Sequence, residues 1–204
     1  MKKVQLDWKI IIGIIIAHIL LFFTFDQSKV FWYILTGTTL FLISYTIMNE
    51  DLDDQLSVLS YLFFGFISGL FLYSLFWAGN SLFDLLNWSS LQNQVVSLYE
   101  KFSPDSIWHY IVLVLVIIPG EEIFWRGFIL KRLSKYMANW TSILLSSVLY
   151  ASVYIYSGYF VLVLAAVISG LIWGLLYVWK RSIPLVIISH LTFDLLLFVF
   201  LPLI

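Results

Sequence analysis

Two adjacent glutamates, Glu121 and Glu122, lie inside an apolar run that reads HYIVLVLVIIPGEEIFWRGFIL, and Arg126 follows four residues after the second. A carboxylate in hydrocarbon costs several kcal/mol unless it is paired, protonated or in contact with water. Helical spacing places Glu122 and Arg126 on one face and rotates Glu121 by about 100°. We therefore expect Arg126 to hold Glu122 ionised, and Glu121, which has no local cation, to act as a general base. The reverse assignment stays open.

A second polar group, HLTFD, lies in the last apolar segment, where His190 and Asp194 are again four residues apart. At about 1.5 Å per residue, Glu121 lies about 15 Å from Lys131 and His190 about 13 Å from Arg181, the basic residues nearest the predicted inner boundary. The two groups can therefore meet in one layer. A lone histidine in a membrane helix is most often a hydrogen-bonding residue, but polar residues gathered at compatible depth favour chemistry.

Pro119 and Gly120 directly precede the glutamates. A proline inside a helix removes one backbone hydrogen bond, so we predict a kink that opens space for water beside the acids. A kink that serves packing alone is the alternative. His18 and His109 lie in other segments, and we interpret both as interfacial or structural.

The chain that must position these residues has 204 residues, of which 62% are hydrophobic and 11% charged, and this combination excludes a soluble globular protein. The apolar segments are about 20 residues long, which is the length of a spanning helix and about twice that of a barrel strand. We therefore predict an all-α, polytopic transmembrane helical bundle. Cysteine is absent, which excludes disulfides, thiolate metal ligands and a cysteine nucleophile.

Cutting the sequence at its polar breaks predicts about seven spans, at 8–25, 30–48, 56–79, 107–130, 139–156, 159–179 and 183–203. The first is expected to be retained, because no small-residue cleavage site follows it. We divide the chain into an N-terminal three-span region, 1–106, and a four-span core, 107–204. Within the first region, 80–106 is predicted to form one or two amphipathic helices on the outer interface, with an ordinary structured loop as the alternative.

The basic residues are distributed unequally between the two sides of this topology. With the N-terminus inside, eight fall on the cytoplasmic side and two on the outer side; the first set is Lys2, Lys3, Lys9, Lys131, Arg132, Lys135, Lys180 and Arg181, and the second is Lys29 and Lys101. This asymmetry follows the positive-inside rule. We expect a multi-pass protein of the cell membrane with a cytoplasmic N-terminus.

The motif EExxxRGxxL at 121–130 and the run SGLIWGLLYVWKRSIPLVIISHLTFD at 169–194 resemble the bacterial CPBP (Abi) family of intramembrane proteases, which is similar to the CAAX prenyl endopeptidase. The resemblance covers the four-helix core. It implies a peptidase in which Glu121 is the base, Glu122 and Arg126 support it, and His190 with Asp194 acts on water or the oxyanion.

The family's middle element, FxxxH, reads Tyr150-xxx-Tyr154 here, and the span at 139–156 contains no histidine. A phenol can donate to an oxyanion or position water, but with a pKa of about 10 it is a poor base at neutral pH. Activity would then depend on Glu121. Asp194 replaces the commoner asparagine and could orient His190 by accepting its ring proton.

We predict from these residues an intramembrane endopeptidase whose cavity opens towards the cytoplasm and whose substrate is a membrane-associated peptide or protein. We expect no cofactor, with a divalent metal on Glu121, Glu122, His190 and Asp194 as the alternative. The lipid bilayer is a partner and nucleic acid is not. The alternative function is a catalytically impaired homologue that binds a sensor kinase or confers bacteriocin immunity. Proton or cation transport has less support, because no repeat is visible.

Overall fold

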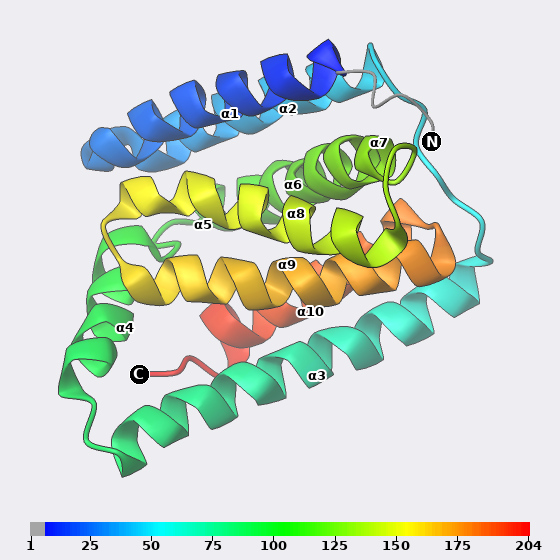
Figure 1. Cartoon of the computed structure of the whole chain (residues 1–204). Coiled ribbons are helices and arrows are strands. Elements are labelled where there is room, and N and C mark those ends of the chain that lie inside the picture. The colour runs from blue at the N-terminus through cyan, green and yellow to red at the C-terminus, as the bar shows by residue number, and fades with distance from the viewer. Residues whose placement is uncertain (1–6) are drawn as a thin grey trace.

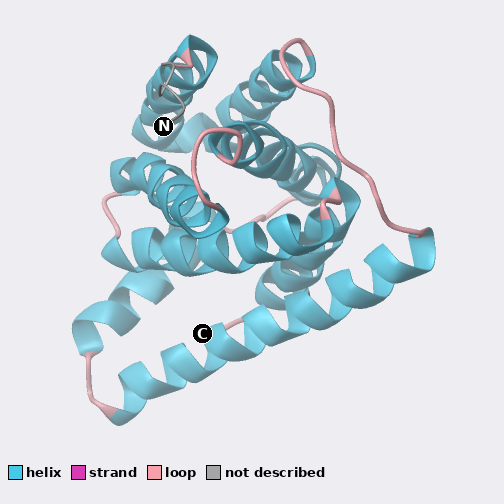
Figure 2. Cartoon of the chain, turned by 45° about the vertical axis from the view of Figure 1, so that its right-hand side comes forward, coloured by secondary structure: helices cyan, strands magenta, loops and turns pink. Residues whose placement is uncertain are grey.

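The computed structural model describes residues 7–204, and in this range the chain is a bundle of helices without a β-strand (Figures 1 and 2). Six helices are long and apolar enough to cross a membrane, namely Trp8–Asp26, Ser28–Ile47, Val58–Leu85, Ile107–Leu133, Phe160–Lys180 and Ile183–Phe200. The predicted all-α polytopic bundle is therefore confirmed, and the protein is a multi-pass membrane protein. Lys2 and Lys3, counted above, lie outside the described residues.

The segment predicted as a span at 139–156 is helical but shorter than the other six. Helix α8 (Asn139–Ser152) has 14 residues and continues as a 3₁₀ segment, Val153–Ser157, which ends at Gly158 in the left-handed conformation. Fourteen α-helical residues extend about 21 Å, less than the roughly 30 Å of a bilayer core. This helix packs along α9 (Phe160–Lys180) (Figure 1).

Helices α1 (Trp8–Asp26) and α2 (Phe31–Ile47) form a hairpin on one side of the bundle, and α3 (Val58–Leu85) runs along α10 (Ile183–Leu195) on the other (Figure 1). The polar stretch predicted to follow residue 79 is helical at first, because α3 continues to Leu85. The rest of 80–106 contains one amphipathic helix, α4 (Ser89–Phe102), which lies at one end of the bundle (Figure 2) and buries Val95. The alternative of an ordinary loop is therefore wrong.

Two GxxxG pairs allow close helix packing. A Cβ at Gly65 would lie 2.7 Å from Ile188 of α10, and a Cβ at Gly69 would lie 2.6 Å from the backbone oxygen of Ser189. The second pair, Gly170 and Gly174, faces α8 in the same way, with Ser147 and Ile143 each at 3.1 Å. Small residues at such positions permit backbones to approach closely.

We expect Gly69→Ala to destabilise the protein by about 1–3 kcal/mol, because the added methyl group meets the α10 backbone, which cannot move as a side-chain end can. Gly79→Ala is the matched control in the same helix, since a Cβ at that position would have nothing within 4 Å. Thermal unfolding in detergent measures both. Equal midpoints for the two variants would show that the close approach carries no energetic weight.

The helix that carries the glutamates contains two π-helical segments. Helix α5 (Ile107–Val112) runs into a π-helical segment, Leu113–Ile117; α6 (Ile118–Phe124) follows, then a second π-helical segment, Trp125–Leu130, and α7 (Lys131–Leu133). Pro119 lies in the first turn of α6, so the predicted disturbance of the helix takes the form of a π-turn just before it. A Cβ at Gly120 would collide with Thr39 of α2, so α2 and α6 are closely packed beside the acids.

A charged cluster ties the loop between α2 and α3 to α7. Lys131 contacts Asp53 at 2.7 Å, Arg132 contacts both Glu50 at 2.9 Å and Asp7 at 2.8 Å, and Lys135 contacts Glu50 at 2.8 Å. Burial raises the pKa of Asp53, but hydrogen bonds from Lys131 and Tyr177 together with nearby positive charge bring it below the ordinary value. This cluster closes the end of the bundle opposite to α4 (Figure 1).

Candidate active site

Glu122 is the centre of a buried polar group. Its side chain has no exposed surface, and its Oε1 accepts hydrogen bonds from Arg126 Nη1 at 3.0 Å and from His190 Nδ1 at 2.7 Å. The guanidinium of Arg126 also lies over the rings of Tyr150 and Trp173, 4.7 and 5.1 Å from their centroids. The predicted pairing of Glu122 with Arg126 is therefore present. Because Oε1 accepts two hydrogen bonds, Glu122 fixes the positions of the Arg126 and His190 side chains.

The ring of His190 is held by a hydrogen bond at Nδ1 and by stacking on an aromatic side chain. Because a carboxylate only accepts, Nδ1 carries the proton that bonds Glu122. The ring stacks on Trp173 with centroids 3.9 Å apart, and Trp173 Nε1 donates to Ser189. Asp194 Oδ2 lies 3.6 Å from Nε2, which is beyond a good hydrogen bond. The carboxylate that orients His190 is thus Glu122, whereas the sequence suggested Asp194.

Glu121 is hydrogen-bonded to two tyrosines of the following helix. Tyr150 donates to Oε2 and Tyr154 to Oε1, each at 2.8 Å, and the two hydroxyl oxygens lie 3.2 Å apart. Among the described residues Glu121 forms no ion pair, in contrast to Glu122. The YxxxY element therefore lies beside the predicted base, where the resemblance places the family's histidine motif. The two glutamates occupy different environments, as their spacing predicted.

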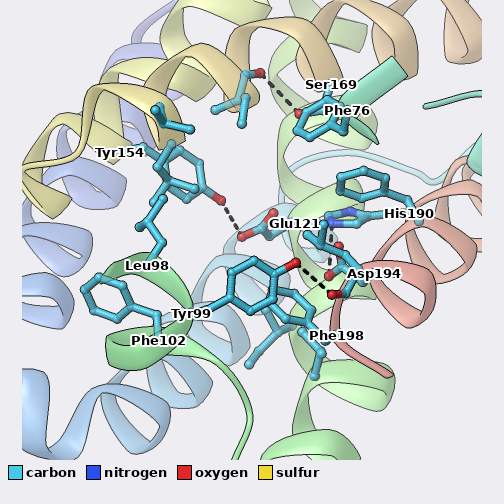
Figure 3. Close-up of a pocket in the computed structure, with 18 of the residues that line it drawn as sticks. Phe76, Leu98, Tyr99, Phe102, Glu121, Tyr154, Ser169, His190, Asp194 and Phe198 are labelled. Atoms are coloured by element: carbon cyan, nitrogen blue, oxygen red, sulfur yellow. Dashed lines mark hydrogen bonds and ion pairs between the residues drawn. The ribbon is translucent and has the colours of Figure 1, made fainter. Parts of the chain in front are cut away.

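A cavity of about 250 Å³ joins these side chains. Glu121, Tyr154, His190 and Asp194 line it (Figure 3), as does Tyr150, whereas Glu122 and Arg126 are buried and do not line it. The remaining lining is mostly apolar and comes from several helices, with Phe31, Leu35, Leu98, Phe102, Leu162 and Phe198 among its residues. The cavity can therefore hold an apolar group against a few polar atoms.

The position of this cavity brings two expectations into conflict. Its lining includes Phe25 at the end of α1, Tyr99 on α4 and Leu162 at the start of α9, all at the end of the bundle opposite to the charged cluster. With the orientation that the basic residues predict, this end faces outward. A cavity open towards the cytoplasm and a cytoplasmic N-terminus are therefore incompatible, and the expected cytoplasmic opening does not fit the predicted topology.

The alternative of a divalent metal does not fit these side chains. In the range 7–204, no group of three or more His, Asp or Glu residues is arranged to hold an ion. Oε1 of Glu122 is shared by Arg126 and His190, and both oxygens of Glu121 accept hydrogen bonds from phenols. A catalytic zinc site needs three protein donors with an open position. We therefore derive no step through a metal.

Other contacts of the site could not be read from the sequence. Trp173 is the stacking partner of His190, but no motif in the sequence distinguishes Trp173 from the other tryptophans of the chain. His109, interpreted above as interfacial or structural, contacts Asp105 at 2.7 Å. His18 lies between Tyr156 and Ser152, at 2.9 and 3.2 Å.

Comparison with known families supports the resemblance. Residues 103–196 match the model of the family described as type II CAAX prenyl endopeptidase Rce1-like, and this range contains every candidate site residue discussed above. No curated protein and no solved structure matches the chain. The EExxxR motif and the downstream HxxxD both lie within the matched range, so residues 103–196 of this membrane protein are similar to the family of type II CAAX prenyl endopeptidase Rce1-like proteins.

Proposed function

We propose that the protein is an intramembrane endopeptidase that hydrolyses a peptide bond of a membrane-associated peptide or protein. The observation that supports this most is the single cavity that Glu121, Tyr150, Tyr154, His190 and Asp194 all line. A glutamate as base, with hydroxyl and imidazole groups in the same cavity, is the set of groups that water-mediated acyl transfer needs. The family match points to the same class of reaction.

In the proposed reaction, Glu121 removes a proton from a water molecule, and the oxygen attacks the carbonyl carbon of the scissile bond. A phenol of Tyr150 or Tyr154, or Nε2–H of a doubly protonated His190 ring, donates a hydrogen bond to the oxyanion that forms. The carbon–nitrogen bond then breaks, and Glu121 returns its proton to the leaving amine. One water is consumed, and the glutamate ends ionised as it began. Glu122 and Arg126 act as positioning residues through His190.

The lining of the cavity favours an apolar substrate segment. Aromatic and aliphatic side chains surround the polar wall, and a charged segment would lose its hydration there. We therefore propose a hydrophobic stretch of a membrane peptide or protein as the substrate, with a peptide pheromone, a bacteriocin or a regulatory membrane protein as examples. No cofactor is proposed.

A second candidate function has its own observation. Both oxygens of Glu121 accept hydrogen bonds from phenols, so the protein's own side chains already hold the carboxylate in place. A homologue that only holds a peptide, as in bacteriocin immunity or in binding a sensor kinase, needs Glu121 for this structural role and not as a base. In that case Glu121→Gln, which can still hydrogen-bond the phenols, would leave the cellular phenotype unchanged.

Hydrolysis can be distinguished from binding by isotope incorporation. The purified protein is incubated in detergent with a library of apolar membrane peptides in H₂¹⁸O, and the products are analysed by mass spectrometry. We expect new fragments whose C-terminal carboxylate carries one ¹⁸O, because water supplies the attacking oxygen. Peptides that bind the protein without any labelled fragment would favour the second candidate.

We further propose the cell membrane as the location, with a cytoplasmic N-terminus and the cavity facing outward. The absence of cysteine permits a direct test, because each introduced cysteine is unique. Ser90→Cys on α4 and Ala138→Cys just before α8 both lie at exposed positions. We expect a membrane-impermeant maleimide to label the cysteine at position 90 in intact cells. The cysteine at position 138 should be labelled only after the cells are permeabilised. The opposite pattern would invert the topology.

A further inference from the structure

Residues 201–203 follow the helical end of the chain in a non-helical conformation, and side chains of two other helices hold their backbone. Tyr73 of α3 donates to the carbonyl oxygen of Leu201 at 2.6 Å, and Asn80 of α3 donates to that of Leu203 at 2.9 Å. The backbone N–H of Leu203 donates to the hydroxyl of Tyr99 on α4 at 3.1 Å. Three polar side chains thus bind backbone atoms of two alternate residues.

This pattern is independent of the side chains that the bound segment carries. In an extended chain, alternate residues present their groups to the same side, so donors and acceptors in a row recognise a peptide backbone as such. The side chain of Leu203 lines the cavity that contains Glu121 and His190. The next residue, Ile204, is 67% exposed and Leu201 is 53% exposed. One apolar side chain therefore enters the cavity while its neighbours remain outside.

Tyr99 is suited to such a role. Burial raises its pKa to about 12, so the hydroxyl stays neutral and can both donate and accept. It donates to the carbonyl oxygen of Leu197 at 2.9 Å while it accepts from Leu203. Tyr73, Asn80 and Tyr99 also lie outside 103–196, the range that matches the family.

We propose that Tyr73, Asn80 and Tyr99 form a subsite for the backbone of an extended apolar peptide, and that residues 201–203 occupy this subsite until such a peptide displaces them. The role of that peptide as a substrate rests on the proposed function, whereas its binding does not. A lipid tail could replace the side chain of Leu203 but would leave the polar groups of the three residues unpaired, which costs free energy. The hydrogen-bond pattern therefore favours a peptide.

The test uses a fluorescent peptide with the sequence LLFVFLPLI, which corresponds to residues 196–204, and full-length protein in detergent carrying Glu121→Gln so that no hydrolysis interferes. Leu203→Asp places a charge in the apolar cavity and should release the segment. Because removing an internal competitor raises the fraction of binding-competent protein, we expect the probe to bind at least about tenfold more tightly. Ile204→Asp adds the same charge at an exposed position and should leave the affinity unchanged.

A further variant tests backbone recognition. Adding Asn80→Leu to Leu203→Asp removes one donor at similar volume, and we expect it to reverse most of the gain in affinity. Leu203→Ala, which carries no charge, should give a smaller gain in the same direction and guards against misfolding of the aspartate variant. An affinity for the probe that is the same in Leu203→Asp, Leu203→Ala and the parent would overturn the proposal. So would a gain that Asn80→Leu leaves intact.

The outcomes also separate this subsite from the proposed function. Tighter probe binding by Leu203→Asp, together with no ¹⁸O-labelled product from protein with Glu121 intact, supports the subsite and contradicts hydrolysis. Labelled product, together with a probe affinity that none of the changes at residue 203 alters, supports hydrolysis and contradicts the subsite.

Discussion

Glu121→Gln is expected to reduce kcat/KM for peptide hydrolysis by at least about 10³-fold, which corresponds to roughly 4 kcal/mol of transition-state stabilisation. The amide has nearly the same shape as the carboxylate and can still hydrogen-bond the phenols of Tyr150 and Tyr154, but it cannot take a proton from water. Since neither phenol is a base at neutral pH, no other group on that side of the cavity replaces it. Steady-state kinetics with a peptide found by the ¹⁸O experiment measures the change.

Glu100→Gln is the matched control for this prediction. Glu100 lies on α4 and is exposed, so the same chemical change is made away from the cavity and activity should be retained. Thermal unfolding of both variants verifies that the fold is kept. Cleavage that persists in Glu121→Gln at the rate of the control would show that Glu121 is not the base, and the mechanism would then be wrong.

The local features of the site could be predicted because they depend on helical spacing. Residues four apart on a helix are neighbours, and the contact between Arg126 and Glu122 at 3.0 Å follows from that geometry alone. The same helical geometry predicts that Glu121 and Glu122 point in different directions and meet different partners. Hydropathy likewise identified the helices, since a chain in hydrocarbon must satisfy its backbone hydrogen bonds within each segment.

Contacts between helices could not be predicted in the same way. Spacing suggested that Asp194 orients His190, but Glu122 on another helix lies closer to the ring, at 2.7 Å. The polar run after residue 79 looked like the end of a span, yet α3 continues to Leu85, because helical hydrogen bonds persist where a helix leaves the apolar region. The side on which the cavity opens depends on how seven helices pack, and no pattern within one helix contains that information.

Arg126→Leu is expected to destabilise the protein by about 3–5 kcal/mol, which for a chain of this length is a fall in Tm on the order of 10 °C. The substitution leaves the Glu122 carboxylate with no exposed surface and without its cation, and its Oε2 already lacks a hydrogen-bond partner among the described residues. It also removes the guanidinium from between the rings of Tyr150 and Trp173. Thermal unfolding in detergent measures the loss.

Two further variants show that this loss comes from an uncompensated charge. Lys135→Leu breaks a contact of similar length, 2.8 Å to Glu50, but Lys135 is 47% exposed, so water replaces its partner and the cost should be below about 1 kcal/mol. Adding Glu122→Gln to Arg126→Leu removes the stranded charge and should restore part of the stability, because the penalty lies in the unpaired ion more than in the missing attraction. If Arg126→Leu were as stable as Lys135→Leu, the energetic importance of the buried pair between Arg126 and Glu122 would be contradicted. If the double variant were less stable than Arg126→Leu, the loss of stability would come from packing and not from the unpaired charge.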